Sequence, residues 1–502
     1  MTSTQRSLYD QYLQQTRQAA DLNGAAALLQ WDQEVYMPAK GARFRARQLA
    51  TLAEAAHELL TADTYGHLLQ ELAAAALPEE EAANIRLSLE DFEKNKKLPA
   101  ALVVALSMAT SQAFEAWIAA RRQNDFSLFL PLLQQIIDLK KEQAARYGYQ
   151  GHPYDALLDD YEKDASVARL DPLFATVREK LPPLLAAIAA GPQVSDALLR
   201  QHFPAGQQFA VSKQILAAMG FDFEAGRQDY SEHPFTTSFS PEDVRVTTRA
   251  DENDLANLLW SSIHEGGHAL YEQGLPVAQY GLPLGQPASL SIHESQSRFW
   301  ENNVGRSLEF MHYLLPLLAQ SFPKQMQGGS PEALFRAANQ VKPSLIRTEA
   351  DELTYHFHVL IRYELEKELI SGALQVADLP HAWDEGYQKY LGIRPGNIKE
   401  GVLQDVHWSH GSFGYFPTYS LGSFYAAQFS QKLEHEIPGL KENIRTGAFA
   451  GINAWLHAHV FQYGRRYRSE ELCRKATGSG LSLEPFLAAA QQKYGAVYNL
   501  KP

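Results

Sequence analysis

Apolar residues recur along most of the chain at the spacing of an amphipathic α-helix. The segments 25–37 (AAALLQWDQEVYM), 44–62 (FRARQLATLAEAAHELLTA), 83–98 (ANIRLSLEDFEKNKKL) and 101–123 (ALVVALSMATSQAFEAWIAARRQ) place them at i, i+3, i+4 and i+7. Short loops marked by proline or glycine separate such segments, and the helical pattern resumes from Asp251 to the end. The pattern predicts a mainly α fold, one large helical body with a cleft.

A different pattern occupies residues 228–249 (QDYSEHPFTTSFSPEDVRVTTR). Apolar and polar residues alternate there, and Phe235, Thr237 and Phe239 fall on one parity. The four residues from Ser240 (SPED) have the composition of a turn. We predict one small β-hairpin in this segment and no other strands.

The bulk composition narrows the class of protein. Of the 502 residues, 45% are hydrophobic and 21% are charged, as in ordinary soluble globular proteins. A net charge of −13 argues against binding to a nucleic-acid backbone. No unbroken apolar run reaches the roughly 18 residues of a membrane span, and the N-terminus lacks the apolar core of a signal peptide, so we predict a cytoplasmic protein that does not enter a membrane. Cys473 is the one cysteine, which excludes an internal disulfide.

The most informative short motif is HEGGH at 264–268. If this segment is helical, His264 and His268 are separated by about one turn and share one face, so two imidazole nitrogens can bind one metal ion. Glu265 lies about 100° around the helix and can approach the same ion without binding it. That position suits a general base that takes a proton from the attacking water.

The flank 251–274 (DENDLANLLWSSIHEGGHALYEQG) supports the helix. Asp251 is a suitable N-cap, and Gly274 is a suitable end. Gly266 and Gly267 each cost about 1 kcal/mol relative to alanine inside a helix. We therefore expect another backbone, or a substrate, to pass close to the helix at these glycines.

A catalytic zinc usually has three protein ligands and one open position. The segment 289–303 (SLSIHESQSRFWENN) reads as a helix with Glu294, Arg298 and Glu301 on one face. Glu294 is the better candidate for the third ligand, and His293 is the rival. Neighbouring residues of a helix point about 100° apart, so both are not expected to bind one ion.

Several motifs together resemble the thermostable carboxypeptidase (carboxypeptidase Taq) family of metallocarboxypeptidases. They run in the family's order and cover most of the chain: WDQEVYMP (31–38), HPF (233–235), DVRVT (243–247), HEGGH (264–268), HESQ (293–296), IRTEAD (346–351) and GVLQDVHW (401–408). No single one of them is specific, but the set is. We see no departure at a motif position.

The resemblance implies a nearly all-helical fold with a deep active-site groove, as in angiotensin-converting enzyme and neurolysin. It implies a homodimer that removes single C-terminal residues from peptides, with broad specificity and poor action on a terminal proline. The metal would be zinc, with cobalt as a substitute. By motif, His264, His268 and Glu294 are the metal ligands, and Glu265 is the base.

The reaction also needs groups that stabilise an oxyanion and grip the substrate. The segment 404–422 contains four candidates for the oxyanion. We favour His407 and Tyr419 for that role and assign His410 and Tyr415 to substrate binding. Each could instead serve packing or a core hydrogen bond.

A carboxypeptidase must bind a terminal carboxylate, which arginine holds with paired hydrogen bonds. We choose Arg347, whose alternative role is an ion pair with Asp351. The rival is Arg245, which could instead tie the hairpin to Asp243. The hairpin edge could also receive an extended peptide by strand addition.

The residues predict a single catalytic domain over 1–502, in which 1–225 forms a helical wall or lid and 226–502 carries the metal and the substrate. Two rival functions remain open at this point. The first is a zinc endopeptidase or oligopeptidase, because the metal motif does not distinguish internal from terminal cleavage. The second is a non-catalytic helical protein that binds peptides.

Overall fold

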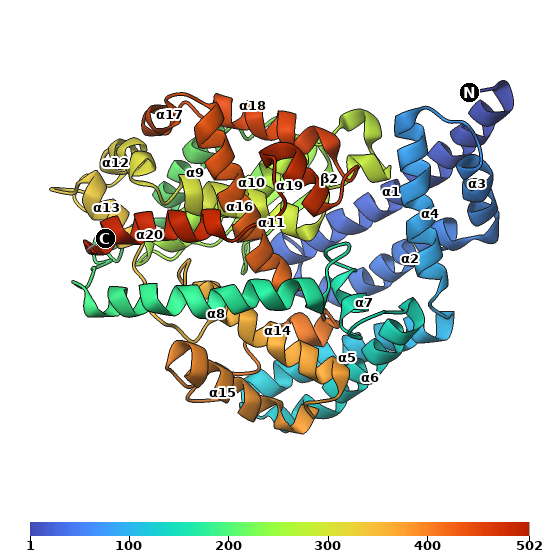
Figure 1. Ribbon diagram of the computed structural model, residues 1–502, viewed down its shortest axis with the longest axis horizontal. Helices are drawn as coiled ribbons and strands as arrows, with labels where there is room; N and C mark the ends of the chain where they lie inside the picture. The colour runs from blue at the N-terminus through green and yellow to red at the C-terminus, as the bar shows by residue number, and fades with distance from the viewer. Residues whose placement is uncertain (501–502) are drawn as a thin grey trace. The chain divides into compact units, whose positions relative to one another are not determined.

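The computed structural model describes residues 1–500, and helices form most of it (Figure 1). This confirms the predicted mainly α class. The chain divides into two units, each assembled from separate stretches of sequence. The first unit comprises 1–96, 195–338 and 425–482, and the second comprises 97–194, 339–424 and the residues from 483 onward. The predicted wall, the division at residue 225 and the groove stay predictions.

The first unit contains the HEGGH segment and the sheet. In Figure 1, α1 runs beside α2, and α3 beside α4. Its helices are α1 (Ser3–Val35), α2 (Ala42–Thr61), α3 (Asp63–Ala73), α4 (Glu79–Lys96), α9 (Ala205–Met219), α10 (Leu255–Gln273), α11 (Leu290–Arg298), α12 (Leu308–Ser321), α13 (Pro331–Ala338), α17 (Leu440–Thr446), α18 (Ala450–His459) and α19 (Ser469–Thr477).

The second unit carries the IRTEAD and GVLQDVHW motifs. Helix α16 (Pro417–Glu436) begins in this unit and continues into the first. The remaining helices of the second unit are α5 (Ala100–Gln123), α6 (Leu130–Tyr147), α7 (Asp155–Leu158), α8 (Val167–Ala190), α14 (Tyr355–Ser371), α15 (Leu379–Leu391) and α20 (Glu484–Tyr498).

The apolar faces predicted for the N-terminal helices form one buried hydrophobic cluster of the first unit. Helices α1, α3 and α4 direct aromatic and aliphatic side chains toward one another, and this burial stabilises their association. The buried members are Tyr9, Tyr12, Tyr65, Leu69, Leu72, Ile85, Phe92 and Leu282.

The strand segment forms a sheet rather than an isolated hairpin. Strands β2 (Thr236–Ser240) and β3 (Asp243–Thr248) make the predicted antiparallel hairpin. The sequence prediction missed β1 (Gly226–Tyr230), which pairs parallel to β3 in the order β1–β3–β2. Strand β1 lacks apolar alternation because its buried side chains are polar. One of them, Gln228, donates a hydrogen bond to Ser262 of α10 at 3.0 Å.

Helix α10 confirms the helix predicted around HEGGH, but its cap differs from the prediction. The N-cap is Asp254, whose carboxylate accepts a hydrogen bond from the N–H of Ala256 at 3.0 Å. Asp251 lies in the preceding turn, so the predicted cap was three residues too early. Gly274 ends the helix as predicted.

Among residues 1–500, α5 is the one helix whose length and apolar composition would suit a bilayer. Its mean hydropathy over the relevant window is 1.3, and 17% of that window is buried. Polar residues interrupt the apolar stretch of α5, so it contains no unbroken apolar run of the length of a membrane span. Length and composition alone are weak evidence for a membrane span, and the absence of one stays a prediction.

Candidate metal centre

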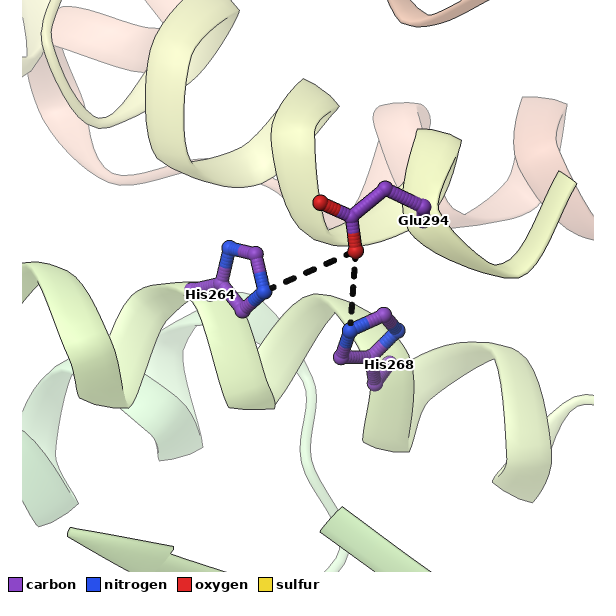
Figure 2. Close-up of side chains that lie close together, drawn as sticks. All are labelled: His264, His268 and Glu294. Carbon is purple, nitrogen blue, oxygen red and sulfur yellow. Dashed lines mark ion pairs between the residues drawn. The ribbon is translucent and has the colours of Figure 1, made fainter. Parts of the chain in front are cut away.

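Helices α10 and α11 bring three potential metal ligands together (Figure 2). The Glu294 Oε2 atom lies 3.8 Å from His264 Nε2 and 3.5 Å from His268 Nε2. One ligand atom from each residue lies within 4.8 Å of the other two. Two imidazole nitrogens and one carboxylate oxygen are a donor set that suits zinc. The three residues therefore fit a metal ion of that kind.

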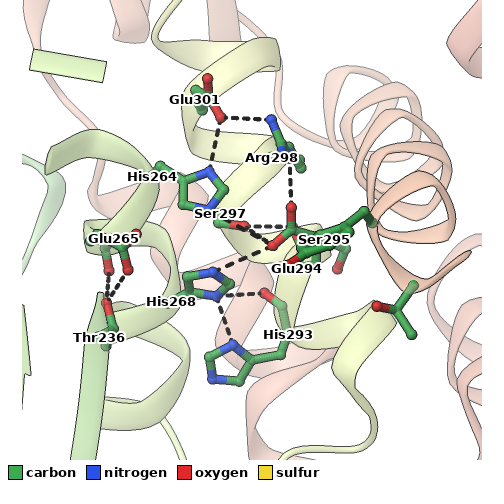
Figure 3. A network of polar contacts seen from close by, with 12 residues as sticks. Thr236, His264, Glu265, His268, His293, Glu294, Ser295, Ser297, Arg298 and Glu301 are labelled. Atoms are coloured by element: carbon green, nitrogen blue, oxygen red, sulfur yellow. Dashed lines mark hydrogen bonds and ion pairs between the residues drawn. The ribbon is translucent and has the colours of Figure 1, made fainter. Parts of the chain in front are cut away.

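A buried carboxylate orients the first histidine of the motif. Glu301 Oε2 lies 2.9 Å from Nδ1 of His264, which leaves Nε2 directed at the ligand cluster (Figure 3). Arg298 and Arg306 donate hydrogen bonds to Glu301 at 3.1 and 3.2 Å. Burial alone would raise the pKa of Glu301, but Arg298 and His264 outweigh burial and hold that pKa well below its usual range. Glu301 is thus an anion that fixes the ring.

The two carboxylate oxygens of Glu294 have different partners. Its Oε1 atom accepts a hydrogen bond from Nε of Arg298 at 2.7 Å, one turn along α11. Burial would raise the pKa of Glu294, but Arg298 and His264 lower it well below its usual range. The predicted face of Glu294, Arg298 and Glu301 is confirmed, and it leaves the ionised Oε2 atom directed at the histidines.

His293, the rival ligand, faces a different partner. Its Nδ1 lies 2.6 Å from Nδ1 of His268, and its Nε2 lies 2.8 Å from Glu272. The backbone oxygen of His293 also lies 3.1 Å from Nδ1 of His268. Burial and the adjacent His293 ring lower the pKa of His268 to about 3. His268 is therefore neutral, which is the form that binds metals.

Glu265 lies beside this cluster and makes a contact that the motif did not reveal. The Thr236 hydroxyl on β2 lies 2.7 Å from Oε2 of Glu265 and donates to it (Figure 3). The Glu265 side chain is buried, and burial raises its pKa. A buried carboxylate with a raised pKa suits proton transfer near neutral pH. In the sequence, the one indication of this role is that Thr236 directly follows the HPF motif.

The two glycines of HEGGH face neighbouring protein. A Cβ on Gly267 would lie 2.5 Å from the backbone oxygen of Gln296 and 2.7 Å from Cα of Ser297, both on α11. A Cβ on Gly266 would lie 2.4 Å from the Leu216 side chain on α9. The alternative of a passing backbone is therefore correct for Gly267. The other alternative, a substrate passing close to the glycines, does not apply, because α9 and α11 occupy that space.

The comparisons with known proteins decide the family. The family model described as carboxypeptidase Taq (M32) metallopeptidase matches residues 11–494. The chain belongs to the carboxypeptidase Taq family. It is accordingly a metallocarboxypeptidase, a peptide hydrolase.

Individual members of the carboxypeptidase Taq family match along nearly their whole lengths. Thermostable carboxypeptidase 1 of Thermus thermophilus is 41% identical, with 99% of this chain and 100% of that protein covered. Carboxypeptidase 1 of Bacillus subtilis is 40% identical, with 95% and 96% covered. The crystal structure of an M32 carboxypeptidase from Deinococcus radiodurans matches with a TM-score of 0.96 at 38% identity, covering 98% of this chain and 100% of that one.

The arginine of the IRTEAD motif is buried in the second unit. Arg347 pairs with Asp405, with Nη2 2.9 Å and Nε 3.0 Å from Oδ1. Its Nη1 donates to the Tyr355 hydroxyl at 3.0 Å. Asp351, the partner weighed from the sequence, instead accepts hydrogen bonds from the backbone of its own loop, including the N–H of Leu353. The ion-pair alternative thus named the wrong carboxylate, because Asp405 lies far away in sequence.

Two of the four oxyanion candidates of this carboxypeptidase lie together. His407 Nε2 is 3.1 Å from the Tyr419 hydroxyl. Burial and the adjacent Arg347 lower the pKa of His407 to about 3, so its ring is neutral. His410 instead packs on Phe114, with 5.1 Å between the ring centres.

The fourth candidate, Tyr415, packs against three aromatic rings. Its ring centre lies 5.2 Å from those of Tyr161 and Tyr419, and 5.3 Å from that of His407. The second unit therefore gathers His407, Tyr415 and Tyr419, while His410 faces a different neighbour.

A buried glutamate that the sequence did not flag holds this loop. Glu366 on α14 accepts hydrogen bonds from Nε1 of Trp408 at 2.7 Å, the N–H of Gly414 at 2.8 Å and the hydroxyl of Tyr154 at 2.5 Å. Burial raises the pKa of Glu366 to about 7. The residues next to Glu366 in the sequence do not indicate its role, because its hydrogen-bond partners are far away along the chain.

Arg245 has the structural role that was weighed against substrate binding. It donates two hydrogen bonds to Asp243, both at 2.9 Å. Its guanidinium group also lies 4.4 Å from the ring centre of Trp31, which is itself buried. Arg245 therefore ties the hairpin to α1. These contacts account for Arg245 without a role in substrate binding.

Proposed function

We propose that this metallocarboxypeptidase removes single residues from the C-terminus of peptides, with broad specificity and poor action on terminal proline. The observation that carries the proposal is the convergence of His264, His268 and Glu294 within 4.8 Å, with Glu265 buried on α10 between the two histidines. We propose zinc as the metal, with cobalt as a substitute. When bound, zinc supplies a Lewis acid that polarises the scissile carbonyl and lowers the pKa of water at the site.

The protein side of the reaction centres on Glu265. Its carboxylate takes a proton from the attacking water and delivers it to the leaving amine nitrogen. The raised pKa of Glu265 helps its carboxyl group to hold the proton between these two transfers. The hydroxyl of Thr236, at 2.7 Å, holds the carboxylate in one orientation. Thr236 thus acts as a positioning residue.

The second unit supplies the groups we assign to the oxyanion and the terminal carboxylate. His407 and Tyr419 are proposed as oxyanion donors, because the neutral imidazole and the phenol both carry hydrogen-bond donors. Tyr415 and His410 remain substrate-binding candidates. Arg347 is proposed to bind the C-terminal carboxylate, and its pairing with Asp405 orients the guanidinium group for that role.

The outer edge of the sheet supports binding of an extended peptide. Strand β2 is an edge strand, and the N–H of Thr247 donates to the carbonyl of Phe235 at 2.8 Å. Hydrogen-bonded pairs alternate along an antiparallel ladder, so Thr236 and Ser238 direct their N–H and C=O groups to the outer edge. A peptide can add to that edge as a further strand.

The function is tested by comparing N-blocked dipeptides and tripeptides that end in a free carboxylate with the same peptides as C-terminal amides. We expect release of one C-terminal residue from the free acids, at least tenfold slower hydrolysis of the amides, and loss of both activities with a chelator. Arg347→Ala should reduce the preference for the free acid. Equal cleavage of acids and amides, or cleavage at internal bonds, would instead support the endopeptidase alternative.

The rival reading as a non-catalytic peptide-binding protein is disfavoured by two findings. The family assignment covers 11–494, and both the ligand set and the base are complete. A purified protein that binds no metal and releases no amino acid would restore that rival. Homodimerisation, a cytoplasmic location and the lack of nucleic-acid or membrane partners remain proposals drawn from the sequence.

Removal of the carboxylate behind His264 should weaken metal binding. We expect Glu301→Ala to raise the metal dissociation constant about 10- to 100-fold, because the ring loses the group that fixes its orientation. Glu301→Gln should have a smaller effect, since its amide oxygen still accepts a hydrogen bond. The measurement is competition for zinc with a chromophoric chelator, which requires no activity.

The control for that variant is Glu58→Ala on the exposed surface of α2. It should leave the zinc dissociation constant unchanged. A Glu301→Ala protein that binds zinc as tightly as wild type would show that the hydrogen bond to His264 does not orient the ligand.

A further inference from the structure

The first unit contains a hollow that the metal centre does not use. It lies between α1, the β2–β3 turn and the loop that follows α10, and its volume is about 550 Å³. The apolar side chains of Leu28, Phe239 and Val277 line it. The exposed carboxylates of Asp21 and Glu242, which we call its rim, line it as well.

Strand β2 connects the metal centre with this hollow. At its start, Thr236 contacts Glu265, and at its end, Phe239 and Ser240 line the hollow. A strand rises about 3.3 Å per residue, so the four steps from Thr236 to Ser240 span about 13 Å. The outer edge of one short strand therefore leads from the base to the hollow.

The direction of a bound peptide follows from the reaction. A carboxypeptidase cleaves the last peptide bond, so nearly the whole substrate extends from the scissile bond toward its own N-terminus. A peptide that pairs antiparallel with β2 runs opposite to it, so its N-terminal part lies at the Ser240 end. The residue about four positions before the scissile bond then reaches the hollow.

The charges of the rim favour a cation. Asp21 is exposed and accepts a hydrogen bond from the Tyr280 hydroxyl at 3.0 Å. Glu242 is exposed, and its carboxylate makes no ion pair with any of residues 1–500. The third acid, Asp243, is already paired with Arg245. Two carboxylates are thus available to an incoming positive charge.

We propose that this hollow is a distal subsite that binds the N-terminal end of a peptide substrate, and that it favours a free α-ammonium group or a basic side chain there. The inference rests on the proposed function and adds a preference for substrate length and charge. A pentapeptide places its ammonium group at the rim, whereas a tripeptide ends before it reaches the hollow.

The test compares kcat/KM for a neutral pentapeptide and a neutral tripeptide, each with a free and an N-acetylated amine. Acetylation should lower kcat/KM of the pentapeptide about twofold to fivefold more than that of the tripeptide, as for an exposed ion pair. The difference should shrink as salt is raised. In the double variant D21N/E242Q it should disappear, and the control Glu58→Gln should retain it.

A steric variant tests the place of the subsite independently of charge. Ala25 is exposed on α1 and lines the hollow, so Ala25→Trp fills the space without disturbing a core. It should lower the ratio of pentapeptide to tripeptide kcat/KM at least about threefold. Equal effects of acetylation on both lengths, or a ratio unchanged by Ala25→Trp, would overturn the subsite. Failure of the wild type to cleave even the tripeptide would instead overturn the proposed function.

Discussion

Glu265→Gln is expected to lower kcat for peptide hydrolysis by about 10²- to 10⁴-fold, the range in which a general acid–base contributes. Glutamine retains the shape of the side chain and an oxygen that accepts from Thr236, but it cannot take a proton from water. Glu265 is not one of the three proposed metal ligands, which are His264, His268 and Glu294, so the metal content should stay at the wild-type level. Steady-state kinetics on an N-blocked dipeptide and metal analysis of the same sample measure both quantities.

The matched control for this variant is Thr236→Val, which keeps the carboxylate and removes only the hydroxyl contact at 2.7 Å. Its kcat should fall far less than that of Glu265→Gln. A Glu265→Gln enzyme with kcat within tenfold of wild type, and with its metal bound, would remove Glu265 from the role of base.

Gly267→Ala should destabilise the first unit and disturb the metal centre together. The added methyl would lie 2.5 Å from the backbone oxygen of Gln296 and 2.9 Å from its carbonyl carbon. Backbone cannot rotate away, so α10 and α11 must separate. Overpacking of this kind costs about 1–3 kcal/mol, and a clash with backbone lies toward the upper end of that range. The gain in helix propensity of about 1 kcal/mol then leaves a net destabilisation of up to about 2 kcal/mol. Because α11 carries Glu294, zinc affinity should fall as well.

Gly266→Ala provides the comparison. Its methyl would meet the ends of the Leu216 and Met219 side chains on α9, which can shift more easily than backbone. It should lower the midpoint of thermal unfolding less and leave zinc affinity closer to wild type. If Gly267→Ala unfolded at the wild-type temperature and kept its zinc affinity, the contact between α10 and α11 would be looser than the structure shows.

The local parts of the candidate centre were predictable from spacing. The i, i+4 histidines, the adjacent glutamate and the face shared by Glu294 and Arg298 are properties of one helix turn. The mid-helix glycines also indicated a close approach, although they did not identify α9 and α11 as the neighbours. Within a helix, position along the chain determines which side chains share a face, so sequence suffices.

Other features depend on contacts between distant segments, and the sequence missed them or named the wrong partner. Strand β1 is stabilised by pairing with β3 and by the bonds of buried Gln228, rather than by its own apolar pattern. The cap moved from Asp251 to Asp254, because several acidic residues precede α10 and only the fold selects one of them. Arg347 forms its ion pair with Asp405 rather than with Asp351, which is nearby in the sequence.

The sequence by itself determined the helical class, the metal motif on one helix and the family to which the chain belongs. These properties follow from local periodicity and from short motifs whose order along the chain is specific as a set. Only the tertiary structure decided that Glu301 holds His264, that Thr236 holds Glu265 and that Glu366 holds the loop around Trp408. In each case the partners come from different elements, and a hydrogen bond between them exists only once packing has brought those elements together.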